Sequence, residues 1–205
     1  ADDPVIRWLV PDDDEYDAQH QAMFGNIARR WLATDSLWCT DDVAALAGWV
    51  PPGRPEVDPE GVEPVDHPDW RIARFAALRD ALGSNTPPER HWYLNMLATH
   101  PDWQRQGLGA TLMRHGFDAA DEEGLPCYLE TETVENVAYY RHHGFEVRSE
   151  WDVRTTDSDG PHWPDDVKAV ASPASPLPQD TALLLYTSGS TGLPGARSAR
   201  RFREA

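Results

Sequence analysis

The segment Gln104–Gly109 combines two glycines with an arginine, at a spacing suited to binding a diphosphate. The apolar and aromatic run 91–99 before it predicts a strand, and a helix is predicted to begin where the segment ends. Main-chain N–H groups at the start of a helix, with the helix dipole behind them, attract phosphate groups. Gly107 and Gly109 let an anion approach the backbone closely, and Arg105 adds a positive charge. We therefore expect a diphosphate site between this strand and this helix.

A second segment with a recognisable pattern covers residues 136–145 and reads Asn-Val-Ala-Tyr-Tyr-Arg-His-His-Gly-Phe. The dinucleotide-binding spacing G-x-G-x-x-G is absent from the first segment because position 112 is Leu, which disfavours a dinucleotide fold. Together the two segments resemble the GCN5-related N-acetyltransferase (GNAT) superfamily. Its diphosphate loop reads Q/R-x-x-G-x-G/A, and its later segment reads N-x-x-x-Y-x-x-x-G-F. The stretches that look most like the puromycin N-acetyltransferase branch are 38–49, His91–Leu94 and Leu129–Thr131.

The resemblance covers residues 1–154 and implies an acyltransferase that moves an acetyl group from acetyl-CoA to an amine. The resemblance also implies that the transfer is direct, in a ternary complex, and that it uses no metal. The resemblance implies that the strand, the loop and the later helix hold the co-substrate, through Leu97, Ala98, Thr99, Gln104, Arg105, Gln106, Gly107, Leu108, Gly109 and Asn136. It further implies that the strand pairs with the pantetheine arm and that a backbone N–H near Leu97 meets the thioester oxygen. Tyr140, at the general acid position of the family, would protonate the leaving thiolate.

Three residues remain candidates for the proton acceptor. Most amines arrive protonated, so a carboxylate, or a water held by one, must remove a proton before the attack. Glu130 is the first choice, because the puromycin-like branch has Glu at the same place before Thr. Glu132 and His91 are the alternatives.

The chain carries a strong negative charge, with 35 acidic and 18 basic residues and a formal net charge of -17. Such a charge repels nucleic acids and anionic membranes, and it favours a small cationic amine as the acceptor. Cys39 and Cys127 lie far apart in apolar surroundings, which predicts two reduced core thiols. The sequence contains no long apolar run and no signal peptide pattern, so a soluble, cytoplasmic protein is expected. The oligomeric state, the acceptor and the acyl chain preference stay open.

The resemblance implies an α/β (α+β) fold, the GNAT fold, in which a central mixed, mostly antiparallel sheet is flanked by helices. Helical spacing is found after Asp12 as far as Trp31, around 72–82, from Leu108 to the capping Gly124, and over 136–143. Strand patterns cover 37–40, 43–50, 91–99, 127–131 and 145–153.

Both ends of the chain depart from the GNAT pattern, which leads us to expect that the first strand, most of the first helix and the usual last strand are missing. We expect an acetyltransferase domain over 1–156, a Pro-rich linker over 157–180 and a separate, non-functional tail over 181–205. The tail resembles the Y-T-S-G-S-T-G core motif of acyl-adenylate-forming enzymes but is too short to build their pocket. Its apolar residues 182–187 are suited to dock as the missing last strand. The alternative function is a catalytically degenerate protein that only binds acyl-CoA.

Overall fold

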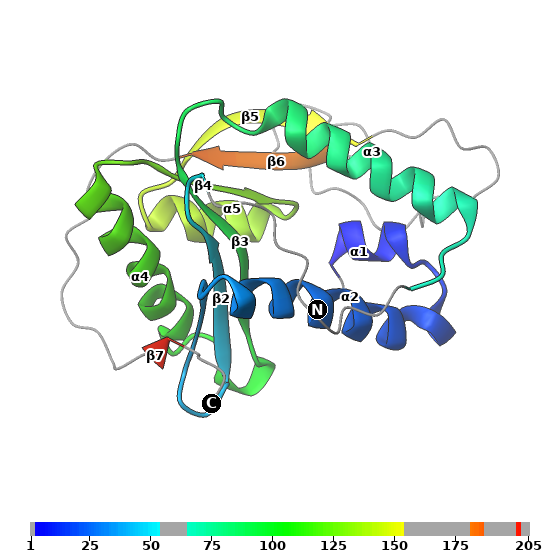
Figure 1. The fold of residues 1–205 in the computed structure, drawn as a ribbon, viewed down its shortest axis with the longest axis horizontal. Coiled ribbons are helices and arrows are strands. Elements are labelled where there is room, and N and C mark those ends of the chain that lie inside the picture. Colours follow the sequence, from blue (N-terminus) through cyan, green and yellow to red (C-terminus); the bar gives the residue numbers. More distant parts are fainter. Residues whose placement is uncertain (1–2, 54–64, 154–180, 187–199, 202–205) are drawn as a thin grey trace.

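The computed structural model describes residues 3–53, 65–153, 181–186 and 200–201, and Figure 1 shows helices on both sides of a central group of strands. The helices are α1 (Pro4–Leu9), α2 (Asp13–Ala33), α3 (Asp69–Asn85), α4 (Leu108–Glu123) and α5 (Val134–His142), with a short 3₁₀ turn η1 (Pro101–Trp103) before α4. The strands are β1 (Leu37–Cys39), β2 (Ala45–Val50), β3 (Trp92–Thr99), β4 (Cys127–Thr131), β5 (Glu146–Asp152), β6 (Thr181–Tyr186) and β7 (Arg200–Arg201).

The strands form one sheet in the order β5-β6-β4-β3-β2-β1-β7. Among the described strands, only β3 and β4 pair in parallel, and every other neighbouring pair is antiparallel. The predicted fold class, a mixed and mostly antiparallel sheet flanked by helices, is therefore confirmed.

Strand β6 lies between β4 and β5, and it pairs antiparallel with both. Residues 181–186 thus occupy the place that the missing last strand was expected to leave open, as the docking hypothesis requires. The two residues of β7 pair with β1 at the opposite edge, where the sequence predicts no strand. The predicted linker, and the parts of the tail other than β6 and β7, lie outside the described residues.

Helices pack on the two faces of the sheet through contacts between glycines and tryptophans. A Cβ on Gly48 would lie 2.5 Å from the ring of Trp31 in α2, and a Cβ on Gly116 in α4 would lie 2.2 Å from the ring of Trp49. Neighbouring residues of a strand point to opposite faces, so Gly48 and Trp49 in β2 meet different helices. Accordingly, α2 and α4 cover opposite faces of β2 (Figure 1).

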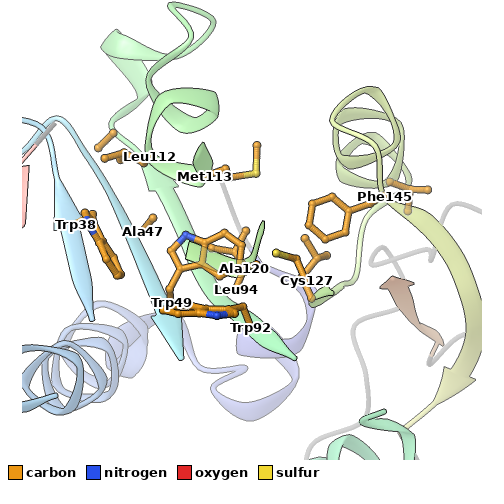
Figure 2. Packing of buried hydrophobic residues seen from close by; sticks show 13 residues of the cluster. Trp38, Ala47, Trp49, Trp92, Leu94, Leu112, Met113, Ala120, Cys127 and Phe145 are labelled. Carbon is orange, nitrogen blue, oxygen red and sulfur yellow. The ribbon is translucent and has the colours of Figure 1, made fainter. Parts of the chain in front are cut away.

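The larger of two hydrophobic clusters lies between the sheet and helices α4 and α5, and Figure 2 shows the two tryptophans Trp49 and Trp92 in its middle. Helix α4 contributes Leu112, Met113 and Ala120, which recur at helical spacing. Cys127 belongs to the same cluster, and Cys39 is also buried, so both thiols lie in the core, as predicted. Burial raises the pKa of the Cys127 thiol to about 12, so the thiol stays protonated at neutral pH and is unreactive.

A second cluster joins α1, α2 and α3, and two buried arginines of α3 hold it together. Arg71 Nε donates a hydrogen bond to the carbonyl oxygen of Leu9 (3.0 Å), and Arg74 donates one to the carbonyl oxygen of Trp8 (2.5 Å). These bonds satisfy carbonyl groups at the C-terminal end of α1, which have no partner inside the helix. None of the described helices is both long and apolar enough to cross a membrane.

Candidate active site

Strands β3 and β4 are paired over only a small part of their length. Their parallel ladder consists of Trp92 with Cys127 and Tyr93 with Tyr128. Beyond Tyr93, β3 continues to Thr99 with β2 along one edge, and no described strand pairs with its other edge. Unpaired backbone groups on such an edge can bond an extended ligand as an added strand would. The predicted co-substrate residues Leu97, Ala98 and Thr99 lie in this section.

The turn from β3 into α4 presents free N–H groups to solvent. Gly107 begins the helix with a left-handed backbone (φ 81°), and no side chain caps the helix. The first helical bond runs from Thr111 N to the Gly107 carbonyl oxygen, so the N–H groups of residues 108–110 have no partner within α4. Arg105 also has a positive φ (60°), which is uncommon for a residue with a side chain and often marks a functional turn.

The Gln104 side chain fastens this turn to the strand, because its Nε2 donates to the carbonyl oxygen of Thr99 (3.3 Å). The side chain of Gln106 donates to the carbonyl oxygen of Asp102 (3.4 Å). Residues 101–107 are all exposed, whereas Leu108 and Gly109 are half-buried at the start of α4. A Cβ on Gly107 would have no heavy atom within 4 Å, so the space above this residue is open.

Helix α5 places the two residues predicted from the second motif in different surroundings. Tyr140 is half-buried and packs on the larger core cluster, with its ring edge-on to Phe145 at 5.8 Å. Burial, followed by the nearby Tyr139 and Glu132, raises the pKa of the Tyr140 hydroxyl, which keeps it protonated. Asn136 is exposed and is not the helix cap, because Thr133 Oγ1 accepts from its backbone N–H (3.3 Å). The helix therefore begins at residue 134, two positions before the predicted start.

Glu130 in β4 lies among polar side chains of two strands. The Tyr128 hydroxyl donates to Oε1 of Glu130 (2.5 Å). Asn95 Nδ2 donates to the Tyr93 hydroxyl oxygen (2.9 Å), and the Tyr93 ring lies 5.4 Å from that of Tyr128. Burial raises the pKa of Glu130, and the nearby hydroxyls of Tyr128 and Tyr93 offset part of this effect. The result is a carboxylate that is bonded to one tyrosine hydroxyl and lies near a second.

Glu132, the first alternative to Glu130, follows directly after β4. Burial first, and then the charges of Asp3 and Glu130, raise its pKa to about 8. It also lies near enough to Tyr140 to raise the pKa of that hydroxyl. Glu132 is therefore a carboxyl group that titrates near neutral pH, close to the predicted general acid.

His91, the second alternative, lies beside the same tyrosine as Glu130. Its ring meets that of Tyr128 edge-on at 5.1 Å, and its Nδ1 donates to the carbonyl oxygen of Glu89 (2.7 Å). This bond fixes the orientation of the imidazole and leaves Nε2 as the nitrogen that can accept a proton.

Four groups of this region were not predicted from the sequence: Tyr139, Tyr93, Tyr128 and Asn95. The hydroxyl of Tyr139 in α5 lies beside Gly109, where a Cβ would be 2.9 Å from its oxygen and 3.4 Å from Cδ2 of Leu97. The end of β3, the start of α4 and helix α5 thus come together. Among the described residues, no group of three or more His, Cys, Asp or Glu side chains is placed to hold a metal ion.

Comparison with known proteins matches residues 7–145 to the acetyltransferase (GNAT) family. A Corynebacterium glutamicum structure described as "histone acetyltransferase HPA2 and related acetyltransferase" is 19% identical, with 93% of this chain and 85% of that chain covered and a TM-score of 0.55. A mosquito arylalkylamine N-acetyltransferase is 16% identical, with 74% of each chain covered and a TM-score of 0.42. A nourseothricin acetyltransferase is 16% identical, with 73% of this chain and 61% of that chain covered and a TM-score of 0.38. At these identities the likeness concerns the fold.

Proposed function

Because the chain belongs to the acetyltransferase (GNAT) family and is thus an acyltransferase, we propose that it moves an acetyl group from acetyl-CoA to the amine of a small cationic molecule. The observation that supports this proposal most directly is that β3 and β4 separate beside the start of α4, which no side chain caps. An unpaired strand edge next to free helical N–H groups suits a ligand with an amide-containing arm and a diphosphate.

The residues of this region fit acetyl-CoA. The free N–H groups at the start of α4 and the open space above Gly107 suit the diphosphate, and Arg105 adds a positive charge. The unpaired edge of β3 at Leu97–Thr99 suits the pantetheine arm, and Asn136 is exposed on the neighbouring helix. When bound, the co-substrate supplies a thioester whose carbonyl carbon accepts the amine. The Leu97 N–H would bond the carbonyl oxygen and stabilise the negative charge that develops on it.

Two side chains would move the protons of the reaction. Glu130 would take the proton of the ammonium group, directly or through the Tyr128 hydroxyl that is bonded to it. Its raised pKa makes it a stronger base than an exposed carboxylate. Tyr140 would give its proton to the thiolate, and the raised pKa of its hydroxyl keeps that proton available at neutral pH.

The carboxylates on this face support a cationic acceptor. Glu130 lies in β4 and Glu132 follows directly after this strand, and the charge of Glu130 acts on Glu132. The charge of Asp3 acts on Glu132, and the chain as a whole carries a formal charge of -17. The stretches 91–94 and 129–131, which look like the puromycin N-acetyltransferase branch, agree with an acceptor of the aminonucleoside or antibiotic type. We further propose that the tail beyond β6 takes no part in catalysis.

The test combines calorimetry with an assay of thiol release on the full chain. CoA should bind, and acetyl-CoA should release thiol with at least one cationic amine from a panel of polyamines, arylalkylamines and aminonucleosides. Absence of heat on CoA titration would contradict the site. Binding without turnover on any amine would instead favour the degenerate acyl-CoA-binding protein.

Glu130→Gln tests the proton acceptor. We expect kcat to fall by about 10²-fold, the lower end of what acid–base catalysis contributes, while the Kd for CoA stays the same. Glu122→Gln, an exposed position in α4, is the matched control and should retain full activity. If the kcat of Glu130→Gln were unchanged, Glu130 would not be the proton acceptor, and Glu132 and His91 would be the remaining candidates.

A further inference from the structure

The two adjacent tyrosines of α5 point into different surroundings. Tyr140 packs on the larger core cluster, whereas Tyr139 is 37% exposed. The Tyr139 hydroxyl reaches the start of α4, where a Cβ on Gly109 would lie 2.9 Å from its oxygen. The same Cβ would lie 3.4 Å from Cδ2 of Leu97. Of the two phenols, Tyr139 is therefore the one whose hydroxyl lies where β3 and α4 meet.

Position 109 is also where the diphosphate is expected. Gly109 is the second residue of α4, and its N–H is one of those without a partner inside the helix. A phosphate group bound by these N–H groups lies beside the main chain of Gly109, within reach of a hydroxyl that touches the missing side-chain position. A side chain at 109 would instead press on this hydroxyl, because its Cβ would lie 2.9 Å from the Tyr139 oxygen.

We propose that Tyr139 is a cofactor-binding residue whose hydroxyl donates a hydrogen bond to acetyl-CoA where its diphosphate meets the start of α4. This inference rests on the proposed function and extends it, because it gives the two tyrosines separate roles. Tyr139 contributes to the affinity for acetyl-CoA, and Tyr140 contributes to proton transfer.

The surroundings of the Tyr139 ring fit this role. The ring lies edge-on to Tyr140 at 5.3 Å and to His143 at 4.7 Å, which limits its freedom before the co-substrate arrives. Burial raises the pKa of its hydroxyl, so the group keeps its proton at neutral pH and can donate to an anion. The family pattern N-x-x-x-Y leaves position 139 unspecified, and the sequence alone therefore does not single it out.

The test compares Tyr139→Phe with Tyr140→Phe in the full chain. For Tyr139→Phe we expect the Kd for CoA and the KM for acetyl-CoA to rise about tenfold, as for loss of a hydrogen bond to a charged group, with kcat nearly unchanged. For Tyr140→Phe we expect the reverse, a lower kcat at a similar KM. Tyr16→Phe, in the second cluster, is the control and should match the wild type.

A shortened substrate locates the contact. S-acetylpantetheine lacks the diphosphate, so wild type and Tyr139→Phe should use it equally well. An equal loss with both substrates would overturn the assignment to the diphosphate, and so would an unchanged Kd for CoA in folded Tyr139→Phe. Failure of the wild type to bind CoA would instead count against the proposed function.

A double-mutant cycle tests the proximity itself. Gly109→Ala should weaken CoA binding less in the Tyr139→Phe background, because the hydroxyl that the new methyl group would meet is gone. Additive effects of the two changes would show that the two positions act independently and would overturn the contact.

Discussion

At the scale of single residues, side chains of the same type that lie one or two positions apart in the sequence differ in their chemistry, because the groups around each of them differ. Glu130 accepts a hydrogen bond from the Tyr128 hydroxyl, and this hydroxyl and the nearby Tyr93 limit the rise of its pKa. Glu132 faces the carboxylates of Asp3 and Glu130 instead, and its pKa reaches about 8. The hydroxyl network therefore favours Glu130 as the group that stays ionised and receives the proton, while Glu132 is the carboxyl group that responds to pH.

The pH response of Glu132 should appear in the stability of the protein. Its pKa is 4.5 as a free side chain and about 8 in the fold, so the unfolded chain holds its charge over a range where the folded chain does not. Between these values, rising pH favours the unfolded state. We expect the free energy of unfolding of the wild type, relative to Glu132→Gln, to fall by at least about 1 kcal/mol across this range, since one unit of pKa corresponds to about 1.4 kcal/mol.

Urea denaturation near both ends of this pH range measures the effect. Glu122→Gln, at the exposed position in α4, serves as the control. If Glu132→Gln behaved like this control, Glu132 would not be the group whose proton uptake is linked to folding.

The sequence predicts those parts of the candidate site whose residues lie close together along the chain at a fixed spacing. The loop 104–109 and the motif at 136–145 are continuous stretches, and their residues fall at the start of α4 and on α5 as expected. The bond from Tyr128 to Glu130 joins residues two positions apart on one strand, a spacing that is visible in the sequence. Tyr93 instead meets Tyr128 through the parallel register of β3 and β4, which no spacing in the sequence encodes, and so the approach of Tyr93 could not be foreseen.

At the scale of the elements, glycines decide how closely two helices approach the sheet. Gly48 gives room to Trp31, and Gly116 gives room to Trp49, which is fully buried. The periodicity of α4 predicts which face is buried, including Gly116, but the sequence does not show which indole that glycine meets. The boundaries of the helices and strands were largely predictable, because residues that end an element, such as the capping Gly124, can be recognised in the sequence.

Gly116→Ala tests this packing. The added methyl group would lie 2.2 Å from the Trp49 ring, which has no free space to move into. Although alanine favours a helix, we expect a net loss of about 1–3 kcal/mol in the free energy of unfolding, the usual cost of overpacking. Gly83→Ala in α3 is the matched control, since a Cβ there meets no heavy atom within 4 Å, and it should leave the stability unchanged or slightly higher. Equal stability of the two variants in urea would contradict the assigned contact.

At the scale of the whole molecule, the sheet is completed by a strand from far along the sequence. Strand β6 is bonded on both sides, to β4 and to β5, whereas β7 is bonded on one side only, to β1. We expect the backbone amides of 182–186 to exchange with deuterium as slowly as those of β4, and the amides of β7 to exchange faster. Rapid exchange across 183–186 would show that β6 does not stay in the sheet.

The net charge acts over the whole molecule and should govern how the acceptor reaches the site. A formal charge of -17 draws cations toward the protein, and dissolved salt screens this attraction over about 10 Å at 0.1 M. With acetyl-CoA saturating, so that its own salt dependence drops out, we expect kcat/KM for a cationic amine to fall several-fold between low and moderate salt. An amine that is neutral at the assay pH should show little change. A similar response of both amines would mean that long-range attraction does not assist the acceptor, and the carboxylates near Glu130 would then act only at contact distance.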